Sequence, residues 1–383
     1  MSRRTPAFAE PLHVGRPNIG DRERLLERFI DLLDRRWLTN DGPYLQEFEQ
    51  RLAEYLGVRH CVAVCNATIG LELAIRALDM TGEVIVPSFT FPATAHALAW
   101  LGVTPVFADV DPTTHTLDPA AVERLVTPRT TGILGVHVWG RSCDVAGLDD
   151  VAERHGLKVL YDAAHALGCT QRGQMLGNFG DAEVFSFHAT KFVNAAEGGA
   201  ITTNDDELAA RLRRMRAFGL ERTEVCDVGT NAKMNELSAA MGLTSLESIN
   251  DFIARNRTNF AAYEKSLAGI PGLKLLSAPP FEQSNCQYVV VDVEARDAGL
   301  TRDQLVSRLH EDNVLAKKYF SPGCHRMEPY RAAHEATGRR LPHTDRLCDR
   351  LLQLPTGTAV DEKMIASIGA ILGNAAIGRR RAA

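Results

Sequence analysis

The stretch EVFSFHATKFVNAAEGGAITT, residues 183–203, decides the fold of this chain of 383 residues. It holds two short apolar runs, 183–188 and 198–203, which predict buried strands. Between them, Lys191 follows the first run closely and precedes the pair Gly198-Gly199. A lysine at such a place is either a solvated surface charge or a nucleophile held where a loop leaves a sheet. The residues that reach the same place decide between these interpretations.

Five further apolar runs lie upstream of this stretch and are separated by segments long enough for helices: 61–65, 83–87, 104–110, 131–139 and 158–164. Strands that are apolar on both faces and alternate with helices favour a mostly parallel sheet with helices on both sides. The predicted fold class is therefore α/β, with a mostly parallel seven-stranded sheet between helices.

The remainder of the chain predicts helices around this sheet and a smaller unit after it. Helical patterns cover residues 22–37, 43–56 and about 234–265. The last third predicts a small α+β unit, with a strand at 288–293, a helix near 302–312, the segment 314–320 and a closing helix after Val360. We therefore divide the chain into a large domain, 1–255, and a small C-terminal domain, 256–383.

The composition of the chain argues against several classes of function. The chain is 45% hydrophobic and 24% charged, with a net charge of −5, so it lacks the basic footprint of a nucleic-acid-binding protein. No apolar run is long enough for a membrane helix and no apolar signal core follows the start, so we expect a cytoplasmic protein. The eight cysteines are scattered without metal-ligand spacing, and we expect no metal site.

Polar and aromatic residues follow several of the predicted strands, where ligands bind in open parallel sheets. Asp162 ends the run 158–162, and a buried carboxylate is costly without a cationic partner. Thr68 lies in a small-residue turn at a helix start, which suits a phosphate but equally suits simple capping. Phe91 follows the run 83–87, and its ring either faces a ligand or packs in the core. Ser186 adds a hydroxyl a few residues before Lys191.

Taken together, an amine, a lone carboxylate, an aromatic ring and phosphate donors fit pyridoxal phosphate. Lys191 would form the Schiff base, and Asp162 would pair with the pyridinium nitrogen. The glycine patterns of dinucleotide-binding and P-loop proteins are absent, which argues against a plain oxidoreductase and against a P-loop enzyme.

Six strings carry a resemblance to a known family. They are GPYLQEFEQRLAEYLG (42–57), PSFTFPATAHAL (87–98), FADVDPTTHTLDP (107–119), YDAAHALGC (161–169), GDAEVFSFHATKFVNAAEGGAITTN (180–204) and NAKMNELSAAMGL (231–243). In this order they resemble the sugar aminotransferases of the DegT/DnrJ/EryC1/StrS family, over about residues 20–370. The resemblance implies a fold type I pyridoxal-phosphate transferase fold and a homodimer with active sites shared between subunits.

The resemblance also implies roles for single residues. Lys191 matches the Schiff-base lysine and Asp162 the partner of the pyridinium nitrogen. The cofactor-binding positions that match are His165 beside the cofactor, Phe91 stacked on its ring, Ala67, Thr68 and Ser186 in the phosphate cradle, and Asn231, supplied to that phosphate by the partner subunit. The sequence departs from the family pattern at Lys233, Ala232 and His96, which bear on substrate contacts and not on the cofactor set.

For the substrates, the resemblance implies glutamate as the amino donor, with pyridoxamine phosphate formed between the two half-reactions. The stretch 229–248 is similar to the branch that forms dTDP-4-amino-4,6-dideoxyglucose, so we expect dTDP-4-keto-6-deoxyglucose as the acceptor. A diphosphate needs hydrogen-bond donors. Candidate substrate contacts are Thr39, Asn40, Lys317, Lys318 and Tyr319, although a solvated lysine pair needs no function.

Other interpretations stay open at this point. The acceptor could instead be a 3-keto sugar or a cyclitol. A dehydratase branch of the family has histidine in place of the lysine, and Lys191 argues against it. A cofactor-binding regulator on the same fold would normally carry a DNA-binding module, and the first forty residues are too few and not basic enough to supply one.

Overall fold

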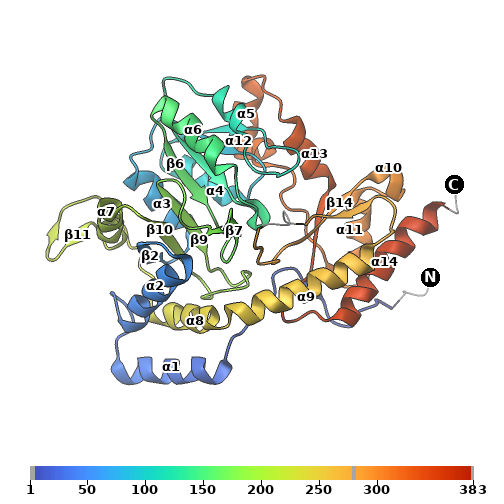
Figure 1. Cartoon of the computed structure of the whole chain (residues 1–383), viewed down its shortest axis with the longest axis horizontal. Coiled ribbons are helices and arrows are strands. Elements are labelled where there is room, and N and C mark those ends of the chain that lie inside the picture. Colours follow the sequence, from blue (N-terminus) through green and yellow to red (C-terminus); the bar gives the residue numbers. More distant parts are fainter. Residues whose placement is uncertain (1–4, 278–281, 381–383) are drawn as a thin grey trace.

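A seven-stranded sheet forms the centre of the computed structural model, which describes residues 5–277 and 282–380 (Figure 1). Strand β10 is antiparallel to both of its neighbours, and the other neighbouring pairs are parallel. This confirms the predicted mostly parallel sheet. In spatial order the strands are β2 (His60–Val64), β10 (Gly199–Thr203), β9 (Ala182–Ser186), β6 (Lys158–Asp162), β5 (Thr130–Val136), β3 (Glu83–Pro87) and β4 (Thr104–Ala108).

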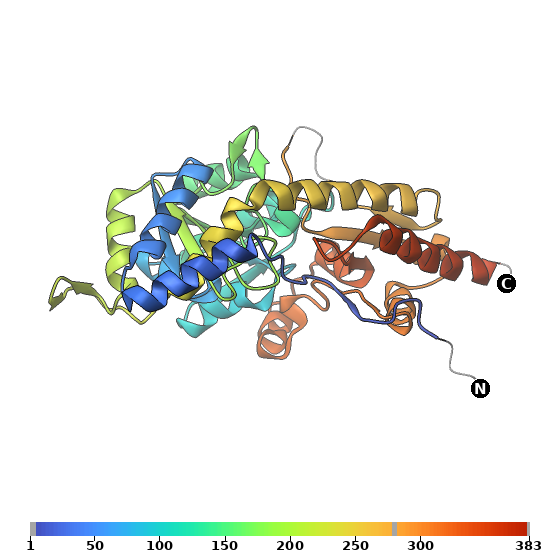
Figure 2. The same ribbon diagram turned by 90° about the horizontal axis from the view of Figure 1, so that it is seen from below.

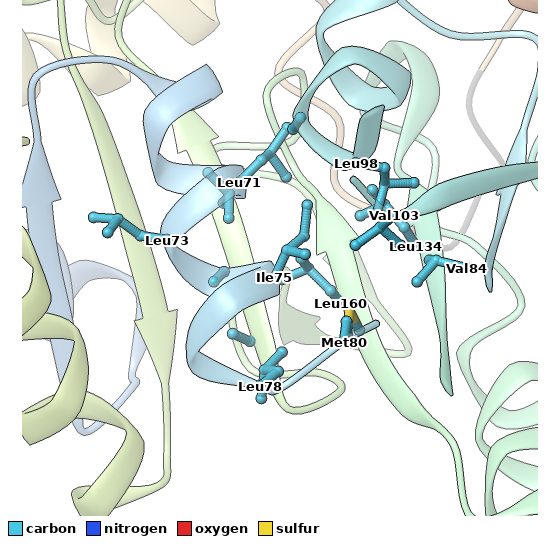
Figure 3. Close-up of a cluster of buried hydrophobic side chains, with 14 of the residues drawn as sticks. Leu71, Leu73, Ile75, Leu78, Met80, Val84, Leu98, Val103, Leu134 and Leu160 are labelled. Atoms are coloured by element: carbon cyan, nitrogen blue, oxygen red, sulfur yellow. The ribbon is translucent and has the colours of Figure 1, made fainter. Parts of the chain in front are cut away.

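Both faces of the sheet are covered because successive side chains of each strand alternate between them. Val62 and Val64 of β2 join one hydrophobic cluster, and Cys61 and Ala63 join another. Figure 3 shows the first cluster, with leucines of one helix packed against the strands. The helices on that face are α3 (Ala67–Ala77), α4 (Pro92–Trp100) and α7 (Asp206–Arg216). The helices on the opposite face are α2 (Pro43–Leu56), α5 (Pro119–Glu123), α6 (Val145–His155), α8 (Glu236–Glu247) and the start of α9 (Ile249–Leu267).

The predicted N-terminal helices are present as α1 (Arg22–Arg35) and α2. Helix α2 begins at Pro43 and ends before Gly57, whose left-handed φ of 68° suits glycine at a helix end. The helical region expected over 234–265 is two helices, because Ser248 between α8 and α9 has φ −93° and ψ 7°.

The C-terminal part contains a three-stranded antiparallel sheet of β13 (Leu273–Leu275), β14 (Val289–Val293) and β16 (Leu351–Leu354). Helices α11 (Arg302–Glu311) and α14 (Glu362–Arg380) cover it, as the sequence predicts for both helices. The segment 314–320 forms a strand only at β15 (Val314–Leu315), which pairs with β1 (Leu12–His13). Figure 2 shows the N-terminal segment, in blue, passing from α1 to this C-terminal part.

Residue 255 lies inside the continuous helix α9, so the division into 1–255 and 256–383 stays a prediction. No helix within the described ranges is long and apolar enough to cross a membrane. The smaller elements are β7 (Thr170–Gln171), β8 (Gln174–Met175), β11 (Leu220–Glu221), β12 (Glu224–Val225), α10 (Ala295–Ala298), α12 (Glu328–Ala336), α13 (Pro342–Arg350) and the 3₁₀ turns at Val138–Gly140 and Cys324–Arg326.

Gly199, at the start of β10, lets this strand approach the N-terminus of α3. A Cβ atom at Gly199 would lie 2.7 Å from the Ala67 nitrogen and 2.9 Å from the Ala67 Cα. Both atoms belong to the backbone, which cannot rotate away as a side chain can. The second glycine after Lys191 therefore sets how closely the helix start sits on the sheet.

Gly199→Ala is expected to destabilise the protein by roughly 1–3 kcal/mol, because the added methyl group overpacks a backbone contact. Urea unfolding followed by circular dichroism measures this difference. The matched control is Gly373→Ala in α14, where the new Cβ would meet its nearest atoms at 3.7 and 3.9 Å and helix propensity favours alanine by up to about 1 kcal/mol. A Gly199→Ala protein as stable as the wild type would contradict the close contact.

Candidate active site

One cavity of about 500 Å³ lies where the ends of the central strands meet the C-terminal part of the chain. Asp162 ends β6 and Ser186 ends β9, and Lys191 lies in the loop between β9 and β10. Of the residues that the sequence singles out, the structure brings eight to this cavity: Ala67, Thr68, Phe91, Asp162, His165, Ser186, Lys191 and Tyr319.

The Lys191 amine is held inside the cavity and not at the surface. Its Nζ donates a hydrogen bond to the Tyr288 hydroxyl over 3.0 Å. The pKa of Lys191 is lowered to about 8, because burial lowers it by more than the charge of Asp162 raises it. At pH 7 roughly a tenth of the amine is therefore unprotonated, and this is the form that acts as a nucleophile or a base.

Asp162 is 7% exposed, and two donors fix its carboxylate. Thr94 Oγ1 donates to Oδ2 over 2.8 Å, and the Ala164 N–H donates to Oδ1 over 3.1 Å. Burial raises the pKa of Asp162, while these two hydrogen bonds and the nearby Lys191 lower it. The result is a carboxylate that is oriented by its neighbours and would gain from a cationic ligand.

His165 forms part of the cavity wall as a neutral ring. Its Nδ1 accepts a hydrogen bond from the Trp139 backbone N–H over 3.2 Å, which places the ring proton on Nε2. Burial and the charge of Lys191 hold the pKa of His165 well below its usual value. Phe91, which precedes α4, presents an aromatic ring with 55% of its surface exposed.

The N-terminus of α3 supplies free backbone donors to the cavity. Asn66 caps the helix, and its Oδ1 accepts from the Ile69 N–H over 2.9 Å. The N–H groups of Ala67 and Thr68 precede the first hydrogen bond within the helix and so have no partner in it. Together with the positive end of the helix dipole, they form a site suited to an anion such as a phosphate.

Other predicted residues lie elsewhere. Thr39 and Asn40 are exposed in the turn between α1 and α2, and Lys317 is exposed beside β16. Lys318 forms an ion pair with Asp303 at 3.3 Å. Asn231 is exposed near the hairpin of β11 and β12, where its Oδ1 accepts from Lys233 Nζ over 2.6 Å. Within one chain, these residues do not line the cavity.

Several lining residues gave no usable signal in the sequence. Tyr288 directly precedes β14, where a tyrosine is an ordinary strand residue. The N-terminal segment also lines the cavity. It is held by Asn18, whose Nδ2 donates to the Phe192 carbonyl over 3.1 Å and whose Oδ1 accepts from Thr358 Oγ1 over 2.8 Å. Only spatial contact reveals these roles.

Comparisons with known proteins show which family this chain is similar to. The model of the DegT/DnrJ/EryC1/StrS aminotransferase family matches residues 20–372. A dTDP-4-amino-4,6-dideoxy-D-glucose transaminase from Escherichia coli is 34% identical over 365 residues, which cover 94% of this chain and 97% of that protein. A GDP-perosamine synthase from Caulobacter vibrioides is 37% identical over 331 residues, covering 85% and 88% of the two chains.

Among solved structures, DesI crystallised in the presence of its TDP-sugar product is 50% identical, with a TM-score of 0.93. The match covers 98% of this chain and 96% of the DesI chain. The structure of 3-amino-5-hydroxybenzoic acid synthase is 27% identical, with a TM-score of 0.86 over 96% of this chain and 100% of that one.

The lowered pKa of Lys191 predicts a specific pH dependence of its chemical reactivity. Acetylation of this amine, followed by peptide mass spectrometry on the folded protein, is expected to speed up as the pH rises and to level off above about pH 8. An ordinary lysine would gain reactivity up to a pKa of about 10.4. Continued gain at Lys191 above about pH 9.5 would contradict the buried environment described for it.

Proposed function

The chain belongs to the DegT/DnrJ/EryC1/StrS aminotransferase family, and we propose that it transfers an amino group from L-glutamate to a nucleotide-linked keto sugar. The enzymes of this family depend on pyridoxal phosphate. The observation that carries this proposal is the convergence of Lys191, Asp162 and the N-terminus of α3 on one cavity. We assign dTDP-4-keto-6-deoxyglucose as the acceptor and dTDP-4-amino-4,6-dideoxyglucose as the product.

The residues of the cavity fit pyridoxal phosphate. Its volume of about 500 Å³ is ordinary for a site that holds a small molecule. Asp162 is a buried carboxylate whose pKa burial raises, so a protonated ring nitrogen would supply the cation that it lacks. The free N–H groups of Ala67 and Thr68, with Ser186 nearby, suit the phosphate, and Phe91 offers a face to the ring.

Bound there, pyridoxal phosphate supplies an electron sink for the pair left behind when a proton leaves the amino donor. Asp162 would keep the ring nitrogen protonated, and the electron-sink capacity depends on that proton. Lys191 would hold the cofactor covalently, and its Nζ, once free, would accept and return the proton. With a pKa of about 8, roughly a tenth of the amine is neutral at pH 7, far more than for an ordinary lysine.

The choice of acceptor rests on similarity. The Escherichia coli relative is named for dTDP-4-amino-4,6-dideoxy-D-glucose, and DesI was crystallised with a TDP-sugar product. Tyr319 lines the cavity as a candidate sugar contact. Arg16 also lines it and has no ionic or hydrogen-bond partner within residues 5–277 and 282–380, so it suits a carboxylate or a diphosphate. Thr39, Asn40, Lys317 and Lys318 stay candidate substrate contacts, and none of them lines the cavity of one chain.

A homodimer with shared sites is part of the proposal. Asn231 faces solvent next to a hairpin that projects from the body of the molecule in both views (Figures 1 and 2). On and beside this hairpin, Phe218, Val225 and Val228 are 50%, 73% and 64% exposed. Apolar side chains this exposed favour an interface, and a partner subunit there would bring its Asn231 to the phosphate of the neighbouring site. We place the reaction in the cytoplasm.

Lys191→Ala is expected to lower amino transfer from glutamate to dTDP-4-keto-6-deoxyglucose by roughly four orders of magnitude, because both the attachment point and the base are lost. Mass spectrometry of the sugar product measures the rate. Lys363→Ala, at an exposed position of α14, is the control and should match the wild type. Appreciable turnover by Lys191→Ala would contradict the role of this lysine.

The acceptor is tested in the same assay. If a 3-keto sugar, a keto cyclitol or a GDP-linked 4-keto sugar is aminated faster than dTDP-4-keto-6-deoxyglucose, the acceptor assignment is wrong and the aminotransferase assignment stands. If no keto compound is aminated although pyridoxal phosphate is bound, a cofactor-binding regulator becomes the better interpretation.

Subunit complementation tests the shared site. Lys191→Ala and Asn231→Ala homodimers should each be strongly impaired, but their mixed dimers contain one intact site. Random mixing should therefore restore about a quarter of the wild-type activity, because half of the dimers are mixed and each has one of two sites intact. Absence of recovery in mixed dimers verified by mass spectrometry would rule out the proposed exchange of Asn231.

A further inference from the structure

Tyr288 forms a hydrogen bond with the Lys191 amine. It directly precedes β14 in the C-terminal part of the chain, whereas Lys191 lies in the loop between β9 and β10 of the central sheet. The two residues are 97 positions apart in the sequence, and Lys191 Nζ donates to the Tyr288 hydroxyl over 3.0 Å. Tyr288 thus brings a polar group from a different part of the chain to the reacting nitrogen.

The ring of Tyr288 is held by packing. Its centroid lies 4.3 Å from that of His165 and 5.4 Å from that of Trp139. Burial raises the pKa of the Tyr288 hydroxyl well above its usual value, and nearby Tyr319, Asp162 and Cys169 act in the same direction. The hydroxyl therefore stays neutral at any pH at which the protein works. Its position is fixed by the rings around it.

A neutral hydroxyl suits a lysine that must gain and lose a proton. An ammonium group has three N–H bonds and a neutral amine has two, so Lys191 can donate to the Tyr288 oxygen in both states. In the neutral state the Tyr288 hydroxyl can also donate to Nζ, since a phenolic hydroxyl is both a donor and an acceptor. A carboxylate at the same place would instead favour the ammonium form and raise the pKa of the lysine.

We propose that Tyr288 is a further catalytic residue, whose hydroxyl holds Lys191 Nζ by one hydrogen bond in both protonation states and so keeps Nζ in position for proton transfer. This inference rests on the proposed function. In the transfer, the C–H bond of the donor breaks and an N–H bond forms on Nζ, while the electron pair stays with the donor and its cofactor. No bond of Tyr288 is made or broken.

The other groups that face Lys191 do not replace Tyr288 in this role. Asp162 is already fixed by Thr94 and the Ala164 N–H. His165 is a neutral ring whose Nδ1 accepts from Trp139. The His137 backbone N–H donates to the Asp162 carbonyl, and its Nε2 is 3.1 Å from the Glu183 carboxylate. In the described part of the chain, the hydroxyl of Tyr288 is the group that hydrogen-bonds to Nζ.

The test is Tyr288→Phe in the full-length, cofactor-loaded protein, which keeps the ring packing and removes the hydroxyl. Tyr161→Phe is the matched control, because the Tyr161 hydroxyl is buried without a hydrogen-bond partner in the described residues. For the half-reaction with glutamate, Tyr288→Phe is expected to lower kcat roughly 10- to 100-fold, with KM changed less than about threefold. Tyr161→Phe should stay within about twofold of the wild type.

Two further readouts separate catalysis from structure. With glutamate deuterated at its α-carbon, the isotope effect on kcat should increase in Tyr288→Phe, because proton transfer becomes slower relative to the other steps. The melting temperature and the affinity for pyridoxal phosphate, titrated through its visible band, should match those of Tyr161→Phe. An unchanged kcat and isotope effect would overturn the proposal, and so would a loss of cofactor binding or folding that accounts for the lower rate.

Failure of this inference and failure of the proposed function look different. If the wild type does not respond to glutamate, the proposed function fails before Tyr288 is considered. If the wild type responds and Tyr288→Phe behaves in the same way, the aminotransferase stands and only the role of Tyr288 falls.

Discussion

Burial of the Lys191 amine near the Asp162 carboxylate is the constraint on which the rest of the site depends. Burial lowers the pKa of the lysine and the charge of Asp162 raises it, and the net result is a pKa of about 8. Thr94 and the Ala164 N–H both donate hydrogen bonds to the Asp162 carboxylate. These two donors, and not Lys191, therefore orient the carboxylate. The central sheet thus supplies a carboxylate that is ready for a cationic ring and an amine that can still lose its proton.

The topology of the sheet brings these groups together. Asp162 and Ser186 end neighbouring parallel strands, β6 and β9, so their side chains reach the same edge. The antiparallel strand β10 returns past that edge, and Gly199 at its start lets the N-terminus of α3 come close enough to offer its free N–H groups. Residues outside the sheet complete the cavity wall: Tyr288, which precedes β14, and the N-terminal segment, which Asn18 holds by a hydrogen bond to the Phe192 carbonyl. One edge of the sheet therefore carries the reacting groups, and distant parts of the chain enclose them.

The sequence predicts the part of this arrangement that depends on local pattern. The strands of the large sheet and helices α2, α11 and α14 follow from apolar periodicity and from proline and glycine at helix ends. Lys191, Asp162 and Thr68 could be singled out because each stands at a strand end or a helix start. Tyr288 and Arg16 could not be singled out, because they reach the cavity only when segments far apart in the sequence come together. In the sequence they do not differ from an ordinary strand or coil residue. The break at Ser248 was also missed, since both helices continue one apolar pattern.

The most direct measurement is to locate the cofactor on the chain. The protein is incubated with pyridoxal phosphate, reduced with borohydride to make the attachment permanent, digested and analysed by peptide mass spectrometry. The account predicts the added mass on Lys191, in the peptide that follows β9, and its loss when Gly199→Ala or Asp162→Ala weakens the site. Labelling of another lysine such as Lys233 or Lys318 in preference to Lys191, or no stable labelling at all, would contradict the account at its centre.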